Sequence, residues 1–330
     1  MSAVAVMPEA PFRPEPLDLA DLRRNPPTVT WLAEPYVPAA ARIWAWGPAE
    51  SAKSMWAMHM AAQLSRQGHH VVVLSQENTL SVEFDRIERT SADERFLRVF
   101  HDQGFDLARQ DHSAVLLDLA AGASFVVIDT LTACWRGDEA DNRAIAEFDA
   151  RVLMPLVKAG ATVLVIHHTG HGGAGGIRRR GADAGRGASS QGQKADVVLE
   201  FDRKADNTFL IRHGKNRMGL GQREPDTYFR ITDRDDGSLE IQTAGRPPGR
   251  GEKAAARTQQ DAETVIQLLM DVGPLSRSEL TLLLASESLS KYRVDKALEA
   301  ADEGGRLSRP SGARGPYAAA QPRPTSDQPL

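Results

Sequence analysis

Short apolar runs alternate with helical patterns through the first half of this chain, and this alternation restricts the fold more than any other feature. The runs are RIWAW at 42–46, VVVL at 71–74, FVVID at 125–129 and TVLVIH at 162–167. Runs of this length and composition are typical of strands buried on both faces. Segments with apolar residues at helical spacing lie between them, at 54–68, 81–90, 113–122 and 142–160. The order strand, helix, strand, helix predicts an α/β fold with a mostly parallel sheet covered on both faces.

The chain of 330 residues divides by composition into a large and a small folded part. A second group of strand patterns, ADVVLEF, TFLIRH, TYFRI and SLEIQT, predicts an antiparallel edge to the sheet. The predicted divisions are a disordered Pro-rich arm at 1–30, an α/β domain at 31–243, a linker at 244–258, a small helical domain at 259–319 and a disordered tail at 320–330.

Composition excludes some classes of protein. The formal charge of −4 excludes a uniformly basic chain, so any nucleic-acid contact must come from local clusters of Arg and Lys. One cysteine cannot form an intramolecular disulfide, and no apolar run is long enough to span a bilayer. The start of the chain also lacks the apolar stretch of a signal peptide. We therefore expect a cytoplasmic protein without a membrane segment.

Residues 47–54 read GPAESAKS, which is the phosphate-loop pattern G-x-x-x-x-G-K-[ST] with alanine in place of the second glycine. A predicted strand precedes it and a predicted helix follows it, which is the context that the motif requires. We expect the loop backbone to bind the phosphates of ATP, Lys53 to bind the β- and γ-phosphates, and Ser54 to bind Mg²⁺. The whole loop forms the expected nucleotide site: Gly47, Pro48, Ala49, Glu50, Ser51, Ala52, Lys53 and Ser54.

Ala52 raises the question of whether this loop functions normally. If the backbone needs a positive φ there, alanine costs on the order of 1–2 kcal/mol relative to glycine. The methyl group would also crowd an approaching phosphate. A loop with a different backbone would lose much less.

Two carboxylates follow buried strands. Asp129 ends FVVID and Glu77 follows VVVLS, so both are expected at the carboxyl edge of the sheet, where open α/β sheets bind ligands. Asp129 is a candidate for Mg²⁺ binding, with helix capping as the alternative. Glu77 is a candidate for orienting or deprotonating the water that attacks the γ-phosphate, with a solvated loop acid as the alternative.

As a set, the motifs resemble RecA-like ATPases of the plasmid RepA-type hexameric helicase group over about residues 31 to 240. The motifs that carry the resemblance are GPAESAKS with its flanks, LSQEN, VVIDTLTACWRGDEADN, VLVIHHTGHGG, RGASSQGQKADVVLEF and HGKNRMG. The chain departs from the family pattern at two positions. Ala52 replaces the expected Gly, and His171 stands where many relatives carry Lys. The resemblance implies a hexamer, a fold with a RecA-like sheet, and a DNA-stimulated ATPase.

The resemblance also implies roles for single residues. Lys53 and Ser54 match the phosphate and Mg²⁺ ligands, Asp129 the second metal carboxylate, and Glu77 the catalytic carboxylate. His168 matches the polar sensor of the γ-phosphate, although the adjacent His167 is an alternative. Lys215 and Arg217 match a basic finger pair that reaches the nucleotide of a neighbouring subunit. Their spacing puts both on one side of an extended segment, and the alternative is a solvated basic turn.

Single-stranded DNA is the expected partner of the Gly- and Arg-rich segment that follows His168, because flexible backbone with several guanidinium groups suits phosphate contacts without sequence preference. The alternative is a disordered loop that binds nothing in particular. The candidate residues are Arg178, Arg179, Arg180 and Arg186.

The C-terminal part resembles a winged helix-turn-helix, with three helical patterns followed by a short Arg- and Gly-rich hairpin. It could contact duplex DNA, or it could organise protein partners or the oligomer, since acidic residues nearly offset its cations. The candidate DNA contacts are Lys291, Arg293 and Lys296 on the second helix of the pair and Arg306, Arg309 and Arg314 on the wing.

These features together predict an ATP-hydrolysing, RecA-like DNA motor, with a replicative helicase of the mobile-element type as the leading hypothesis. Two alternatives stay open. One is a nucleotide-switched DNA-binding regulator with weak hydrolysis, and the other is a RecA-type recombination or repair ATPase.

Overall fold

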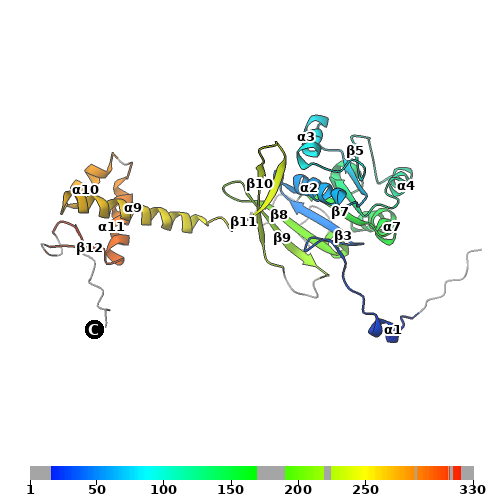
Figure 1. Ribbon diagram of the computed structural model, residues 1–330, viewed down its shortest axis with the longest axis horizontal. Helices are drawn as coiled ribbons and strands as arrows, with labels where there is room; N and C mark the ends of the chain where they lie inside the picture. The colour runs from blue at the N-terminus through cyan, green and yellow to red at the C-terminus, as the bar shows by residue number, and fades with distance from the viewer. Residues whose placement is uncertain are drawn as a thin grey trace, which may run out of the picture. The chain divides into compact units, whose positions relative to one another are not determined.

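The computed structural model describes residues 16–168, 190–218, 224–286, 288–310, 312 and 315–320. The chain forms two compact units, Met1–Gly245 and Arg246–Leu330 (Figure 1). No helix among the described residues is long and apolar enough to cross a membrane.

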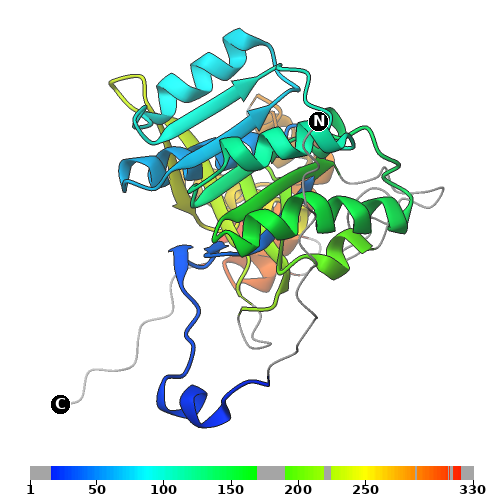
Figure 2. The same ribbon diagram turned by 90° about the vertical axis from the view of Figure 1, so that its right-hand side faces the viewer.

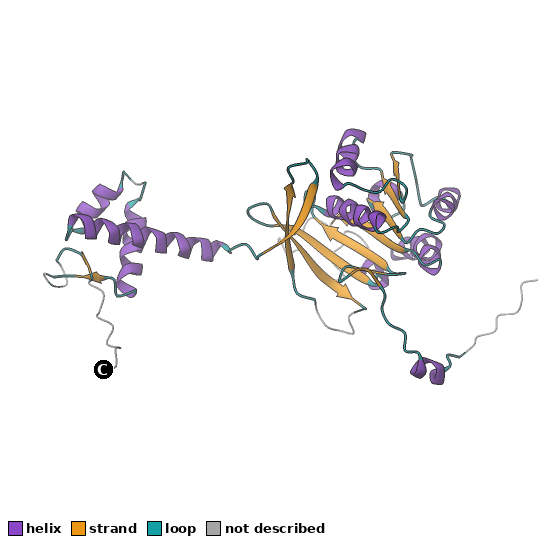
Figure 3. Ribbon diagram, in the orientation of Figure 1, coloured by secondary structure: helices purple, strands orange, loops and turns teal. Residues whose placement is uncertain are grey.

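Within its described residues, the first unit is built on a nine-stranded sheet in the order β11-β10-β9-β8-β3-β7-β6-β4-β5. Its strands are drawn in orange in Figure 3. The strands are β3 (Arg42–Gly47), β4 (Val71–Ser75), β5 (Leu97–His101), β6 (Phe125–Asp129), β7 (Thr162–His168), β8 (Val197–Arg203), β9 (Thr208–Asn216), β10 (Thr227–Asp233) and β11 (Leu239–Ala244). Strands β3 to β8 pair in parallel, whereas β8, β9, β10 and β11 pair antiparallel. A separate antiparallel pair, β1 (Trp31–Ala33) and β2 (Val37–Pro38), precedes the sheet.

Helices cover both faces of this sheet (Figure 2). One face packs on α2 (Lys53–Arg66) and α3 (Leu80–Thr90), through an apolar cluster that includes Trp56 and Leu64. The other packs on α4 (Gln110–Leu119) and on a helical stretch made of α6 (Asn142–Phe148), a π-helical turn (Asp149–Leu153) and α7 (Met154–Lys158). Short helices α1 (Leu19–Arg24), α5 (Leu131–Cys134) and α8 (Ser190–Lys194) complete the unit.

The predicted α/β class is confirmed for the first unit, whose sheet is mostly parallel, is covered by helices and has an antiparallel edge. Each of the four apolar runs forms a strand of the parallel part. Strand β7 lies between β3 and β6, so the strand that ends in Asp129 is not adjacent to the strand that leads into the phosphate loop. The carboxyl ends of β3, β7, β6 and β4 therefore lie side by side.

The second unit contains three helices and a small hairpin among its described residues. These are α9 (Arg250–Val272), α10 (Arg277–Leu284), α11 (Lys291–Glu303), β12 (Leu307–Ser308) and β13 (Ala318–Ala319). Strands β12 and β13 pair antiparallel, and Leu275 forms a further bridge with Tyr317. The unit has its own apolar core, so it buries its hydrophobic residues without help from the sheet.

Two segments differ from the expectation. The predicted linker 244–258 is helical from Arg250, where α9 begins. Gly249 caps this helix, and its backbone N–H donates to the Glu252 carboxylate at 2.5 Å. The three alanines at 254–256 then extend the helix, since alanine has the highest helix propensity. Within the predicted N-terminal arm, Asp18 caps the short helix α1 through hydrogen bonds from the backbone of Ala20 and Asp21.

Candidate functional site

The phosphate loop joins β3 to α2 at the carboxyl edge of the sheet. Gly47 ends β3 so close to its neighbours that a Cβ there would lie 2.6 Å from both the carbonyl oxygen of Phe201 and the Oγ of Ser51. Glycine is therefore required by space at this position. Ala49 and Glu50 are exposed at the tip of the loop, and Glu50 contacts Arg203 at 3.4 Å.

Ala52 has φ 68° and ψ 15°, which is the left-handed conformation. An alanine in this conformation costs roughly 1–2 kcal/mol, because its Cβ approaches the following carbonyl. The loop therefore keeps the left-handed backbone that glycine favours, and Ala52 adopts this backbone although it is strained. The condition set out for a cost of alanine, a positive φ at position 52, is met.

Lys53 lies inside the loop, with 4% of the residue exposed. Its Nζ donates to the carbonyl oxygens of Gly47 at 3.0 Å and Pro48 at 2.7 Å, and it lies 3.4 Å from the Oγ of Ser51. Burial lowers the pKa of Lys53 to about 8, although the charges of Asp129 and Glu77 oppose this shift. The ammonium group is thus held over the loop by backbone oxygens, which a phosphate could replace.

Ser54 and Asp129 meet across β7. The Ser54 hydroxyl donates to Oδ1 of Asp129 at 3.0 Å. Burial raises the pKa of Asp129 to about 6, while the hydrogen bond from Ser54 lowers it. An ionised carboxylate at this depth would be stabilised by a nearby cation.

A hydroxyl and a carboxylate fit Mg²⁺, which usually takes one or two protein oxygens together with water and phosphate oxygens. The described residues contain no group of three or more His, Cys, Asp or Glu side chains that could hold a metal by themselves. The Ser54–Asp129 pair therefore fits a metal bound together with a nucleotide and does not form a closed protein cage.

Glu77 and His168 face each other from the ends of β4 and β7, two strands that are separated in the sheet by β6. Nε2 of His168 lies 3.3 Å from Oε1 of Glu77, and both side chains are partly exposed. His167, by contrast, is fully buried, with its Nε2 3.8 Å from Glu139 and its ring against Trp44. Since successive side chains of a strand point to opposite faces, only His168 is directed to the carboxylate. The structure thus separates the two histidines that the sequence left as alternatives.

Sequence reasoning missed two residues near this site, Glu83 and Arg86 of α3. Glu83 is 2% exposed and lies 3.5 Å from Nη1 of Arg86 and 3.5 Å from Nδ2 of Asn78. After burial and the Ser54 hydrogen bond, the charges of Arg86 and Glu83 also act on the pKa of Asp129. Helical periodicity provided no signal for Glu83 in the sequence, because Leu80 and Phe84 are 66% and 60% exposed while the acid between them is buried.

Lys215 and Arg217 contact the same segment of their own chain. Lys215 Nζ donates to the carbonyl oxygens of Gly192 and Gln193, each at 2.8 Å, and Arg217 Nη2 donates to Gln193 O at 2.8 Å. These carbonyls lie in α8, the helix that follows the Gly- and Arg-rich segment. Both side chains are therefore bound within their own chain in this structure.

Several residues singled out from the sequence lie outside the described residues. His171, one of the two departures from the family pattern, is among them. The others are predicted DNA contacts, namely Arg178, Arg179, Arg180, Arg186 and Arg314.

Three of the candidate cations of the second unit face carboxylates. Arg293 donates to both carboxylate oxygens of the buried Asp261, at 2.8 and 2.5 Å, and thereby joins α11 to α9 in this structure. Arg306 makes a similar two-bond contact with Glu263. Lys296 pairs with Glu299 at 2.5 Å. A fourth cation, Lys291, is exposed at the start of α11.

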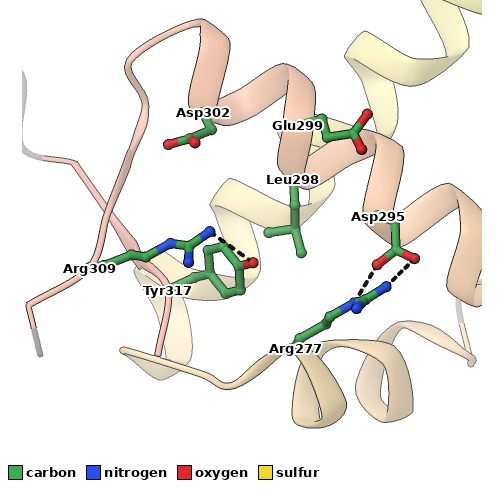
Figure 4. Close-up of a pocket in the computed structure, with 7 residues that line it drawn as sticks. All are labelled: Arg277, Asp295, Leu298, Glu299, Asp302, Arg309 and Tyr317. Carbon is green, nitrogen blue, oxygen red and sulfur yellow. Dashed lines mark hydrogen bonds and ion pairs between the residues drawn. The ribbon is translucent and has the colours of Figure 1, made fainter. Parts of the chain in front are cut away.

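A pocket of about 280 Å³ lies between α11 and the hairpin of the second unit (Figure 4). Asp295, Glu299 and Asp302 of α11 line it, and Arg277 forms an ion pair with Asp295. On the hairpin side, the guanidinium of Arg309 lies 4.4 Å from the ring centre of Tyr317 and donates to its hydroxyl at 3.1 Å. The face of α11 toward this pocket is therefore acidic, which disfavours contact with DNA phosphates there.

Comparison with models of known protein families identifies the family of this chain. A search of curated proteins gave no match. Among solved structures, the chain is similar to an ATPase domain, with a TM-score of 0.47 and 12% sequence identity over 64% of this chain and 92% of that one. The family model of the AAA domain matches residues 8–174, which include the phosphate loop, Glu77, Asp129 and His168. The chain belongs to the AAA domain family.

Proposed function

We propose that this chain is an ATP-hydrolysing DNA motor, and that it is a replicative DNA helicase of the mobile-element type. The observation that carries the ATPase assignment is the alignment of four strand ends. The ends of β3, β7, β6 and β4 gather Lys53 and Ser54, His168, Asp129 and Glu77 at one edge of the sheet. The DNA and helicase roles rest on the resemblance of the motifs.

In this proposal, the phosphates of ATP replace the carbonyl oxygens that now bind Lys53, and the loop N–H groups hold the β-phosphate. Mg²⁺, held by Ser54 and Asp129, would neutralise negative charge on the phosphates. Glu77 accepts a proton from water as the water oxygen bonds to the γ-phosphorus and the bond to the β–γ bridging oxygen breaks. The products are ADP and phosphate.

His168 connects this chemistry to the rest of the chain. Its ring contacts Glu77 at 3.3 Å, and it is the last residue of β7 before the Gly- and Arg-rich segment. A change at Glu77 would thus reach the start of that segment through one side chain. We propose that the segment binds single-stranded DNA through Arg178, Arg179, Arg180 and Arg186.

Lys215 and Arg217 are proposed to act on the nucleotide of a neighbouring subunit in a ring, which by resemblance is a hexamer. Both side chains must first leave the carbonyl oxygens of Gly192 and Gln193, and Arg217 must also leave Asp196, from which it lies 3.6 Å. The second unit is proposed to be a winged-helix module. Lys291 and Arg309 are its remaining candidates for DNA contact, whereas the acidic face of α11 favours a protein partner.

A nucleotide-switched regulator with slow hydrolysis is a second candidate because of Ala52. The strained backbone there raises the free energy of the loop in the form described. A switch tolerates slow turnover, but a motor does not.

The test is steady-state ATP hydrolysis with and without single-stranded DNA across a salt titration. The motor requires turnover that rises with DNA, and the DNA effect should weaken with salt because phosphate contacts release counterions. Lys53→Ala should abolish turnover, with Lys158→Ala, an exposed lysine of α7, as the matched control. ATP binding without DNA-stimulated turnover would support the switch instead.

A further inference from the structure

Gln76 immediately precedes Glu77 and makes more side-chain hydrogen bonds than its neighbours in the loop. Its Nε2 donates to Phe105 O at 2.9 Å and to Ala133 O at 3.1 Å, and its Oε1 accepts from Phe105 N at 2.6 Å. The amide therefore uses both donors and its acceptor on the backbone of two other segments. One of them follows β5, and the other is α5.

The backbone of Gln76 adds a fourth link. Its N–H donates to the carbonyl oxygen of Asp129 at 3.1 Å. A single residue thus joins the end of β4 to the end of β6, to the helix that follows β6, and to the loop after β5. Asp129 and Glu77, the two carboxylates of the proposed site, are tied together through it.

The other side of Glu77 is fixed as well. The carbonyl oxygen of Asn78 contacts Nε2 of His101 at 2.9 Å. The side chain of Glu77 is 45% exposed and contacts His168. The position of the Glu77 carboxylate is therefore set by its flanking residues more than by packing of its own side chain.

We propose that Gln76 is a positioning residue that fixes Glu77 relative to Asp129 and the phosphate loop. This inference rests on the ATPase function proposed above. In this proposal, Gln76 acts through its hydrogen bonds to the protein backbone and not by contact with nucleotide or water. It holds the backbone so that the Glu77 carboxylate lies within reach of the water, and misplacement by about 1 Å can cost on the order of 100-fold in rate.

The test compares Gln76→Ala and Gln76→Met with the wild type. Alanine removes the three side-chain hydrogen bonds, while methionine removes them and keeps most of the volume. We expect kcat to fall by about 10-fold to 100-fold in both variants, with the Kd of a fluorescent ATP analogue within about twofold of the wild type. The midpoint of thermal unfolding is measured in parallel.

The matched control is Gln103→Ala. Gln103 lies in the same connection after β5, and its Nε2 donates to a backbone carbonyl, that of His101, at 2.9 Å. It is exposed, and this hydrogen bond goes to the last residue of β5. Its removal should leave kcat and Kd unchanged.

Three outcomes would overturn the inference. The first is kcat within about twofold of the wild type in both Gln76 variants. The second is an equal loss of kcat and ATP affinity, which would indicate a structural role. If Gln76→Ala fails to fold, Gln76→Met decides between these results. The third is a wild type that does not hydrolyse ATP, in which case the proposed function fails first and the inference falls with it.

Discussion

The two ends of the same parallel sheet differ in how far their charged side chains are paired within the protein. At the carboxyl end, Ala52 is strained, Lys53 is held by backbone oxygens, and Glu77 is partly exposed with one imidazole beside it. At the amino end, charges are paired within the protein. Arg42 donates to Asp196 through Nε and Nη2 at 3.0 and 3.1 Å, and through Nη1 to Asp149.

The amino end is completed by Lys194, whose Nζ lies 3.3 Å from Asp149, and by Arg217, which lies 3.6 Å from Asp196. Three cations thus surround two carboxylates. The contrast indicates two uses of charged residues in one sheet. Those whose partners belong to the same chain stabilise the fold, whereas those whose partner would be a bound ligand are available for chemistry. Substitutions at the two ends should therefore change different measurements.

The strongest response is expected at the carboxyl end. Glu77→Gln removes the proposed proton acceptor while keeping the size of the side chain, so kcat should fall by about 100-fold or more. ATP binding and the midpoint of thermal unfolding should change little. Glu94→Gln, at an exposed acid after α3, is the control. Unimpaired hydrolysis would remove Glu77 from its role.

Asp149→Asn should produce the reverse pattern at the amino end. The side chain is 6% exposed and faces both Arg42 and Lys194, so its loss leaves two cations without that compensating charge. We expect unfolding by urea to show a loss of about 2 kcal/mol, below the range for fully buried pairs because Arg42 and Lys194 keep some solvent contact. ATP hydrolysis per folded molecule should stay unchanged. A variant with reduced turnover and wild-type stability would contradict the comparison.

Acid should abolish the contribution of the Asp196 carboxylate to the free energy of unfolding. Burial raises the pKa of this carboxyl, but the side-chain and backbone hydrogen bonds from Arg42 outweigh it and the net pKa lies below the ordinary 3.8. A lowered folded pKa gives stability that is present above pH 3.8 and lost as the pH falls through the folded value.

Asp196→Asn should therefore be less stable than the wild type at neutral pH, and the two unfolding free energies should converge below pH 3.8. Urea titrations at a series of pH values measure this. A difference that persists undiminished at low pH would show that the carboxylate charge is not its cause.

Ala52→Gly should give the weakest response, and it tests the strained end directly. Removing the methyl group relieves a cost of roughly 1–2 kcal/mol, partly offset by the greater freedom of glycine in the unfolded chain. We expect a small gain in stability and tighter ATP binding by a few fold. Ala49→Gly, at the exposed tip of the same loop, should give neither gain, since Ala49 is not among the residues with positive φ. Equal behaviour of both variants would mean that the strain does not matter to binding.

The sequence predicted the parts of the molecule that local pattern encodes. The strands that end in Gly47, Asp129 and His168 were predicted from apolar runs, and their parallel arrangement brings the expected site residues to one edge. Strand β5 was not predicted. It lies at the edge of the sheet, and Leu97 is its one buried residue. Apolar periodicity does not detect such a strand.

The sequence also did not predict which residues far apart in the chain form hydrogen bonds with each other. Arg42 and Asp196 are 154 positions apart, and Gln76 lies 57 positions from Ala133, so no spacing rule connects them. Arg293 resembled a surface cation because its carboxylate partner, Asp261, belongs to a different helical pattern. Charges identify candidate sites in a sequence, but only the fold shows which of them are already compensated.

The paired histidines at the end of β7 make the site tolerant of a shift in register in one direction. If one residue is inserted ahead of β7, each strand residue moves into the place of the next one, so His167 takes the place of His168 and Ile166 takes the place of His167. An imidazole would then still stand beside Glu77, and an apolar side chain would pack against Trp44. A deletion would instead put Thr169 in the place of His168, and the site would lose its imidazole.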